Sequence, residues 1–183
     1  MAKDVKSMED LFLEEIRDLL DAEKQITKAL PKLAKAATSE ELRTAFNEHL
    51  EQTRGHIDRL ERIFSDIGAK SGGVKCKGME GLLKEGEDMI SQTEEGMVRD
   101  AGLISAAQRV EHYEMAGYGS ARTYAQLLGR DSAATLLEDT LDEEKETDER
   151  LTEIAETMVN QQAMTESRGS AMHTGSAGGF SGS

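Results

Sequence analysis

Apolar residues recur at alternating spacings of three and four along most of the first 158 positions, which is the period of one face of an α-helix. The pattern forms four long stretches, over about 7–36, 40–67, 98–128 and 131–158, and a shorter one over about 79–94. We therefore expect five helices and no β-sheet.

Capping residues and helix breakers mark several boundaries of these stretches. Ser7 and the run Thr38-Ser39-Glu40-Glu41 resemble helix N-termini, and Gly68 and Gly129 follow the ends of two long stretches. Pro31 is expected to kink the first helix without ending it, because the apolar pattern continues beyond it.

Short links join the first helix to the second and the third to the fourth, and a longer connection joins the two pairs. This order is typical of a ferritin-like four-helix bundle with a short crossover helix between helices two and three, so the expected fold class is all-α. Ferritin-like proteins hold two metal ions with carboxylates and histidines from the four helices, a known feature that we recognise rather than deduce.

Metal-ligating residue types interrupt the apolar stripes or lie beside them. Glu23 stands between Leu19 and Ile26, and Glu114 follows Val110 in its stripe. Buried carboxylates are costly unless they are paired, protonated or bound to a cation, so acids on adjacent helices indicate a cation site. The predicted metal ligands are Glu23, His56, Glu111, Glu114, Glu144 and Asp148.

The spacing of these residues repeats between the two halves of the chain. Glu23 and His56 are 33 residues apart, and so are Glu111 and Glu144. In two helical hairpins of equal size, this separation places each pair at the same level. Six oxygen and nitrogen donors that converge in this way suit two ions of iron or manganese.

A purely structural interpretation stays open for each single position, because 36 of the 183 residues are acidic. A buried ion pair with Arg109, Arg122 or Lys145 would also explain an inward carboxylate. His49 fits a satisfied core histidine better than a ligand, although a ligand or supporting role stays open. His112 is expected beside the ligands rather than among them. Tyr118 fits a hydrogen bond to a ligand carboxylate as well as it fits plain core.

Composition and charge exclude several classes of partner. The formal net charge of −14 argues against binding to nucleic acid or to an anionic membrane. No apolar run is long enough to span a bilayer, and the first residues lack the apolar segment of a signal peptide. A single cysteine, Cys76, rules out an internal disulfide. The cytoplasm is therefore the expected location.

The domain division follows from the same pattern. Residues 1–158 are predicted to form the ferritin-like bundle, and residues 159–183, rich in Gly and Ser, a disordered tail. Leu11, Leu20 and Ala29 widen the apolar arc of the first helix, which favours a homodimer.

Several runs of the sequence resemble the YciF-like family of ferritin-like proteins over about residues 7–157. The resemblance implies the bundle fold and a bacterial stress response more than an activity. The runs are Asp21-Ala22-Glu23-Lys24-Gln25, His49-Leu50-Glu51, Cys76-Lys77-Gly78-Met79-Glu80-Gly81-Leu82, Val110-Glu111-His112-Tyr113-Glu114 and Glu143-Glu144-Lys145.

The bundle is also similar to rubrerythrin, whose third helix carries two ligand glutamates at the spacing of Glu111 and Glu114. Where that protein has a Glu and a His in its second helix, this chain has His56 and Arg59, and Asp148 replaces a histidine of the fourth helix. An inward-pointing Arg59 would disfavour a second cation. The cysteine pairs of a rubredoxin-like domain are absent, which excludes electron delivery by that route.

Two functions of different classes follow. The first is a redox enzyme whose iron or manganese centre removes a small oxidant such as peroxide. The second is a non-catalytic stress protein that binds metal or serves only as a dimeric scaffold. Metal content of the purified protein, followed by peroxide consumption, discriminates between them.

Overall fold

The computed structural model describes residues 5–174, and within them every regular element is a helix. The elements are α1 (Met8–Ala36), α2 (Glu40–Asp66), α3 (Lys77–Gln92), α4 (Met97–Leu127), α5 (Asp131–Ile154), a π-helical turn (Ala155–Val159) and α6 (Asn160–Thr174). The predicted all-helical class, with four long helices and one short helix between the second and third, is confirmed.

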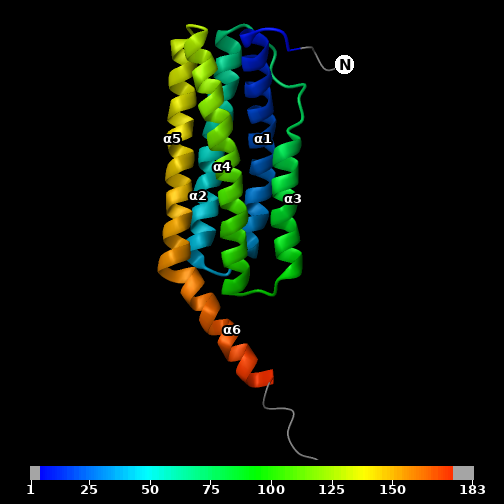
Figure 1. Cartoon of the computed structure of the whole chain (residues 1–183), viewed down its shortest axis with the longest axis vertical. Helices are drawn as coiled ribbons and strands as arrows, with labels where there is room; N and C mark the ends of the chain where they lie inside the picture. Colours follow the sequence, from blue (N-terminus) through cyan, green and yellow to red (C-terminus); the bar gives the residue numbers. More distant parts are fainter. Residues whose placement is uncertain (1–4, 175–183) are drawn as a thin grey trace, which may run out of the picture.

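The four long helices lie side by side, as Figure 1 shows. α1 packs against α2 and α4, and α5 packs against the same two, so that neighbouring helices run antiparallel. After α2 the chain returns along the side of the bundle to α3, which packs against α1 and α4. Helix α3 is thus part of the crossover expected between the two helical pairs.

Local signals set the helix ends much as the sequence predicted. The Ser7 hydroxyl accepts a hydrogen bond from the Asp10 amide at 3.0 Å, and the Ser39 hydroxyl accepts one from Leu42 at 3.3 Å. Gly68 and Gly129 take left-handed backbone angles after α2 and α4, with φ of 66° and 68°. Such angles cost glycine little and reverse the chain after a helix.

A buried acid of α4 fixes the turn between α1 and α2. The Asp100 carboxylate accepts hydrogen bonds from the Thr38 amide at 2.9 Å and the Ser39 amide at 2.6 Å. These amides precede α2 and have no partner inside the helix, so the carboxylate supplies an acceptor there. The two helical pairs are thereby joined at one end of the bundle.

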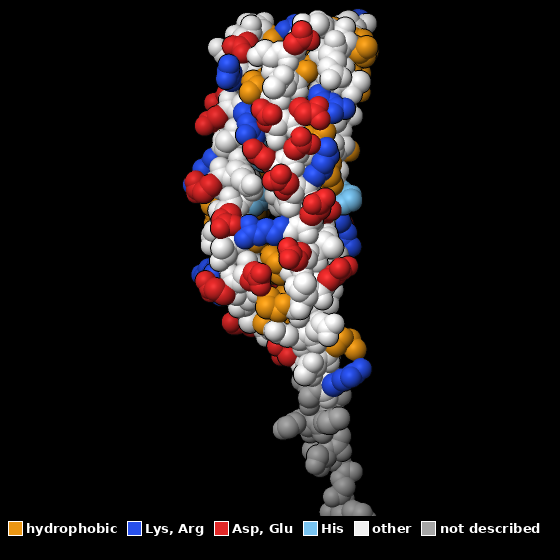
Figure 2. Space-filling view, turned by 90° about the vertical axis from the view of Figure 1, so that its left-hand side faces the viewer, with side chains coloured by type: hydrophobic (Ala, Val, Ile, Leu, Met, Phe, Trp, Pro, Cys, Tyr) orange, Lys and Arg blue, Asp and Glu red, His pale blue; other side chains and the backbone are white. Residues whose placement is uncertain are grey.

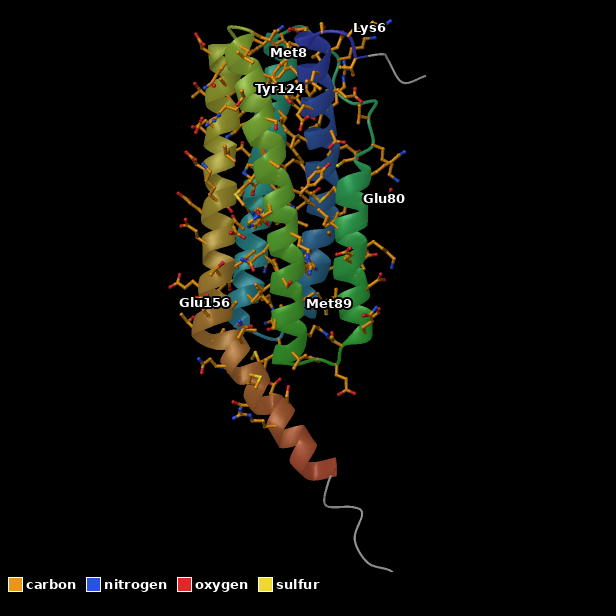
Figure 3. All side chains as sticks on the ribbon, in the orientation of Figure 1. Lys6, Met8, Glu80, Met89, Tyr124 and Glu156 are labelled. Carbon is orange, nitrogen blue, oxygen red and sulfur yellow. The ribbon has the colours of Figure 1, made fainter. Side chains whose placement is uncertain are left out.

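Close approach to α4 holds α3 in place. A Cβ atom on Gly78 of α3 would come within 2.6 Å of the Tyr113 ring, so this helical turn lies directly on the ring. At the other end of α3, Met89 packs against Gly102 of α4 (Figure 3). A larger residue at Gly78 would collide with the Tyr113 ring, and one at Gly102 would require the flexible Met89 side chain to move.

The buried apolar side chains form two clusters, one at each end of the bundle. One is built around Phe12, Leu60 and Tyr118, and the other around Ile26, Phe46 and Leu103. Buried glutamates and histidines occupy the level between the clusters. The fold therefore surrounds a polar band with apolar layers on both sides.

The C-terminal stretch differs from the disordered tail that its composition predicted, since it is helical as far as Thr174. Val159 is fully buried, and the Glu166 carboxylate accepts a hydrogen bond from the Met97 amide at 2.8 Å. Gly96, which precedes α4, has no side chain to cap that helix, so α6 supplies the missing acceptor. Residues 175–183 of that prediction lie outside the described residues.

The wide apolar arc that favoured a homodimer is largely covered within one chain. Leu20 is buried in the cluster around Phe12, and Ala29 lies beside Leu83 of α3. The homodimer stays a prediction, now without this support.

Among the described residues, no helix combines the length and apolar character that crossing a bilayer requires.

Candidate metal centre

The polar band at mid-bundle contains five of the six predicted ligands. Glu23 comes from α1, His56 from α2, Glu111 and Glu114 from α4, and Glu144 from α5. Four of them are 0% exposed and Glu111 is 2% exposed. The helical period places them inward, and the equal spacing of the two hairpins places them at one level.

These side chains form two groups that share one residue. Glu23, His56 and Glu144 make the first group, and His49, Glu111, Glu114 and Glu144 make the second. Within each group, one ligand atom per residue lies within 4.8 Å of all the others. Because Glu144 belongs to both, its two oxygens can serve adjacent positions.

Two histidines face the acids across this band. His56 Nδ1 lies 3.0 Å from Glu144 Oε1 and 3.3 Å from Glu23 Oε1. His49 Nε2 lies 3.5 Å from Glu111 Oε1 and 4.0 Å from Glu144 Oε2. Neither nitrogen has hydrogen-bond geometry toward a partner within the described chain. Each of these nitrogens therefore points a lone pair or a proton into the polar band, where it makes no hydrogen bond.

Unsatisfied carboxylate oxygens provide the test of whether a cation fits here. Both oxygens of Glu114, both of Glu144, and one each of Glu23 and Glu111 are buried without a hydrogen-bond partner among the described residues. Leaving such atoms unpaired is costly, whereas a cation would satisfy several at once. Carboxylate and imidazole donors together suit iron and manganese. The residues fit two such ions.

Electrostatics describe the same band without a cation. Burial, followed by the neighbouring acids, raises the pKa values of Glu111 and Glu114 well above their usual range. Burial also raises the pKa of Glu23, despite the attraction of His56. Burial alone would lower the pKa of His56, but its contacts with Glu144 and Glu23 raise it to about 10. Burial would raise the pKa of Glu144, yet the same contact with His56 lowers it. Without a cation, bound protons thus neutralise part of the negative charge of the carboxylates.

The far side of the His56 ring is held by an ion pair at the bundle edge. His56 Nε2 lies 2.8 Å from Glu143 Oε2, and Arg59 binds both oxygens of Glu143 at 2.6 and 2.7 Å. Arg59 therefore points away from the band, and Glu143 balances its charge. The expectation that an inward-pointing Arg59 would disfavour a second cation therefore does not apply. A proton on Nε2 that is donated to Glu143 leaves Nδ1 free for a ligand bond.

Two more side chains support the band. The Tyr118 hydroxyl donates a short hydrogen bond to Glu23 Oε1, which matches the first of the two roles considered for this tyrosine. The other ring nitrogen of His49, Nδ1, lies 3.4 Å from both Gln52 Oε1 and Thr147 Oγ1. His49 was expected to be a satisfied core histidine, but its Nε2 faces the acids. Its position two turns before His56 on one apolar stripe was the available signal.

Asp148 lies apart from the two groups. Its side chain is 20% exposed, accepts a hydrogen bond from Gln108 at 3.1 Å and lies 3.4 Å from His112 Nε2. Four residues after Glu144, Asp148 is rotated by about 40° around the axis of α5, so its side chain lies nearer the bundle surface although the helix stays in the core. His112 is itself exposed and contacts Asp148 rather than the band.

The basic residues considered as partners for the buried acids bind elsewhere. Arg122 pairs with Glu138, Lys145 with Asp142 and Arg109 with Glu85. Among the described residues, the histidines are the only basic groups within 4.0 Å of the buried glutamate oxygens of the band.

Comparisons with known proteins agree with this architecture. Protein YciF of Escherichia coli K12 is 48% identical over 160 residues, which cover 87% of this chain and 96% of that protein. The crystal structure described as the E. coli stress protein YciF matches with a TM-score of 0.82 over 85% of this chain and 99% of that one. YcfI of Rhodopseudomonas palustris matches at 40% identity and a TM-score of 0.80, over 83% of this chain and 97% of that one. The resemblance to YciF is thus confirmed. A family model described as "Domain of unknown function (DUF892)" matches residues 7–164, and the chain belongs to that family.

Proposed function

We propose that this protein is a ferritin-like four-helix carboxylate protein that binds two ions of iron or manganese in the polar band. The observation that carries the proposal is the set of buried, unsatisfied oxygens on Glu114 and Glu144, in two donor groups that share Glu144. A buried carboxylate without a partner is stable only if something neutralises it.

Each residue has a defined part in this proposal. Glu23, His56 and Glu144 would hold one ion, and His49, Glu111, Glu114 and Glu144 would hold the other. The remaining residue predicted as a ligand, Asp148, would stay outside the coordination groups. When bound, such ions supply redox chemistry toward a small oxidant such as peroxide. The protein's own groups orient the ligands and keep water away.

The stress-response context comes from a relative, since the matched E. coli structure is described as that of a stress protein. We propose the same context for this chain. A peroxide-consuming reaction in the cytoplasm of stressed cells is the finer form of the proposal.

The alternative is a non-catalytic stress protein in which protons replace cations. The contact of His56 with Glu144 and Glu23 favours this function, because a charged imidazole between two carboxylates already balances part of the negative charge. The raised pKa values of Glu111 and Glu114 remove the remainder by protonation.

Thermal melts of the cation-free protein with and without added Fe²⁺ or Mn²⁺ test the proposal. A cation that binds only the folded state stabilises it by about 2.7 kcal/mol at a free concentration of 100 times Kd. Glu114→Gln removes a carboxylate whose two oxygens have no partner, so the cation-free variant should be at least as stable as the parent. It should also lose most of the stabilisation by metal.

Glu146→Gln removes the same charge from an exposed position of α5 and is the matched control. It should keep the stabilisation by metal. If neither metal changes the melting temperature of the parent protein, the proposal is wrong and the non-catalytic, metal-free function remains.

A further inference from the structure

An apolar cavity adjoins the polar band on its His49 and Glu111 side. Its volume is about 30 Å³, and α1, α2, α4 and α5 contribute to its walls together with Leu83 of α3. A second cavity of about 20 Å³ lies farther out, between α1, α3 and α4. Five residues border both cavities. These are Ala29, Leu33, Leu83, Ala107 and Val110.

The walls and the inner end of this space differ in chemistry. The shared walls are aliphatic and offer no hydrogen bonds, whereas an enclosed water needs two to four polar partners. The inner cavity ends at a polar side lined by Gln52, Thr147, Arg150, His49 and Glu111. The His49 Nε2 and Glu111 Oε2 atoms on this side are buried without hydrogen-bond partners in the described chain. The space therefore runs from aliphatic walls to two unused polar atoms of the candidate centre.

Helix α3 forms the outer cover of both cavities. Leu83 borders each of them, and Gly86 borders the outer one. Lys32 of α1 and Glu87 of α3 also border the outer cavity, and their 2.9 Å ion pair joins the two helices there. Both side chains are about half exposed or more, so this pair is weak and can open at small cost.

We propose that these two cavities form a binding site for a small, uncharged, apolar molecule of the size of a diatomic gas, which enters beneath α3 and comes to rest beside His49 and Glu111. About 10–15 Å³ is enough for one water-sized molecule, so each cavity has room for such a guest. Charged molecules are excluded from passing between the cavities, because the aliphatic walls that both cavities share cannot replace their hydration. The site rests on the proposed function and deepens it, because it gives a diatomic gas, rather than polar peroxide, a route to the cations. Binding in the cavities does not itself require cations.

Xenon is the probe for this site, because it is apolar and of similar size. The cation-free protein, labelled at methyl groups, is titrated with xenon under pressure and followed by NMR. The methyl resonances of Leu30 and Leu151 at the inner cavity should shift in a saturable way, and so should those of Leu82 and Ile90 at the outer cavity. Those of Leu60 and Ile63 in the opposite cluster should not shift.

Two variants fill the cavities, and one matched variant does not. A Cβ atom on Gly86 would lie 3.8 Å from Ala106 Cβ and 3.9 Å from Leu33 Cδ2, which is ordinary contact, so Gly86→Ala fits and narrows the outer cavity. Ala107→Val narrows both. Gly81→Ala, in the same helix with open space around it, gives the same gain in helix propensity without entering either cavity.

We expect Gly86→Ala to lose the xenon shifts of the outer cavity, Ala107→Val to lose both sets, and Gly81→Ala to keep both. Because Gly86→Ala adds helix propensity without a clash, it tests the proposal even if Ala107→Val folds poorly. Absence of saturable shifts in the parent, or equal shifts in the parent and both filled variants, would overturn the binding site. The cation melts would be unaffected by that failure, so the two proposals can fail separately.

Discussion

Glu143 and Glu144 follow each other in α5, and the helix turns their side chains about 100° apart. Glu144 therefore points between the helices and is 0% exposed, whereas Glu143 lies at the edge and contacts His56 and Arg59. One acid belongs to the candidate ligands, and its neighbour orients a ligand. The two acids differ in role only because their side chains point in different directions around the helix axis.

Glu143→Gln tests the orienting role. The variant keeps an acceptor near His56 Nε2 but loses the charge that holds Arg59, so the affinity for Mn²⁺ should fall by about 10–100-fold. Titration calorimetry measures the affinity, and the ¹⁵N shifts of the His56 ring, followed against pH in the cation-free protein, report at which pH and from which nitrogen the ring loses its proton. A purely structural role would lower stability without moving that ring signal. Glu138→Gln, which also leaves an arginine of the bundle edge without its carboxylate, is the control and should keep both the affinity and the tautomer.

Residues of the candidate centre differ in how well the sequence alone could identify them. Glu23, Glu114 and Glu144 stand out because a position in an apolar stripe depends only on the local helical period. The partnership of Glu143 with Arg59 depends on how α2 is rotated against α5, which no local pattern reports. Asp148 shows the same limit, since one turn along α5 was enough to carry it away from the band.

At the level of whole helices, α6 shows how a tertiary contact can order a stretch that composition marks as disordered. The helix begins after a π-helical turn, a local irregularity that redirects the chain away from the bundle axis (Figure 1). Its Glu166 carboxylate binds the Met97 amide at the start of α4. That contact links residues 69 positions apart in the sequence, so no local sequence pattern predicts it.

Glu166→Gln should therefore destabilise the protein by about 0.3–1 kcal/mol, the usual value of an acid at a helix N-terminus. Deletion after Val159 should cost at least as much, contrary to what composition suggested for this segment. Denaturant unfolding measures both. Glu156→Gln, an exposed acid on the preceding turn, is the control and should change stability little. Equal stability of Glu166→Gln and the parent would show that the cap contributes nothing.

The helix bounds themselves were within a few residues of the prediction for all five elements of the bundle, because caps and breakers act locally. Where α3 lies was not predictable in the same way. Its position depends on Gly78 meeting the Tyr113 ring and Gly102 meeting Met89, which are contacts between distant segments.

At the scale of the whole molecule, the net charge of the chain is −14, and it has acidic side chains in its interior as well as on its surface. On the face that Figure 2 shows, acidic side chains are interleaved with basic ones. Surface acids are hydrated and can pair with lysines and arginines there. The interior acids at mid-bundle have protons, two histidines, the Tyr118 hydroxyl and, in our proposal, cations as partners. Binding of cations must therefore displace protons.

This exchange gives the last prediction, and its sign follows from the pKa shifts. Burial and the neighbouring acids raise the pKa values of Glu111 and Glu114 well above their usual range, and the contacts of His56 with Glu144 and Glu23 raise its pKa to about 10, so the band without a cation favours the protonated forms of all three. A bound cation needs their deprotonated forms. Binding of Mn²⁺ near pH 7 should release protons, and the apparent affinity should rise with pH until those groups have titrated.

Calorimetry in buffers of different ionisation enthalpy measures the number of protons released, from the dependence of the observed heat on the buffer. Glu114→Gln contributes no titrating carboxyl and should release fewer protons than the parent at equal saturation. Glu146→Gln should match the parent, because the Glu146 side chain is exposed and lies outside the polar band. Heats that do not depend on the buffer would mean that the cation binds groups that are already deprotonated. Such a result would indicate that the cation binds to acidic side chains at the surface and not to the buried acids at mid-bundle.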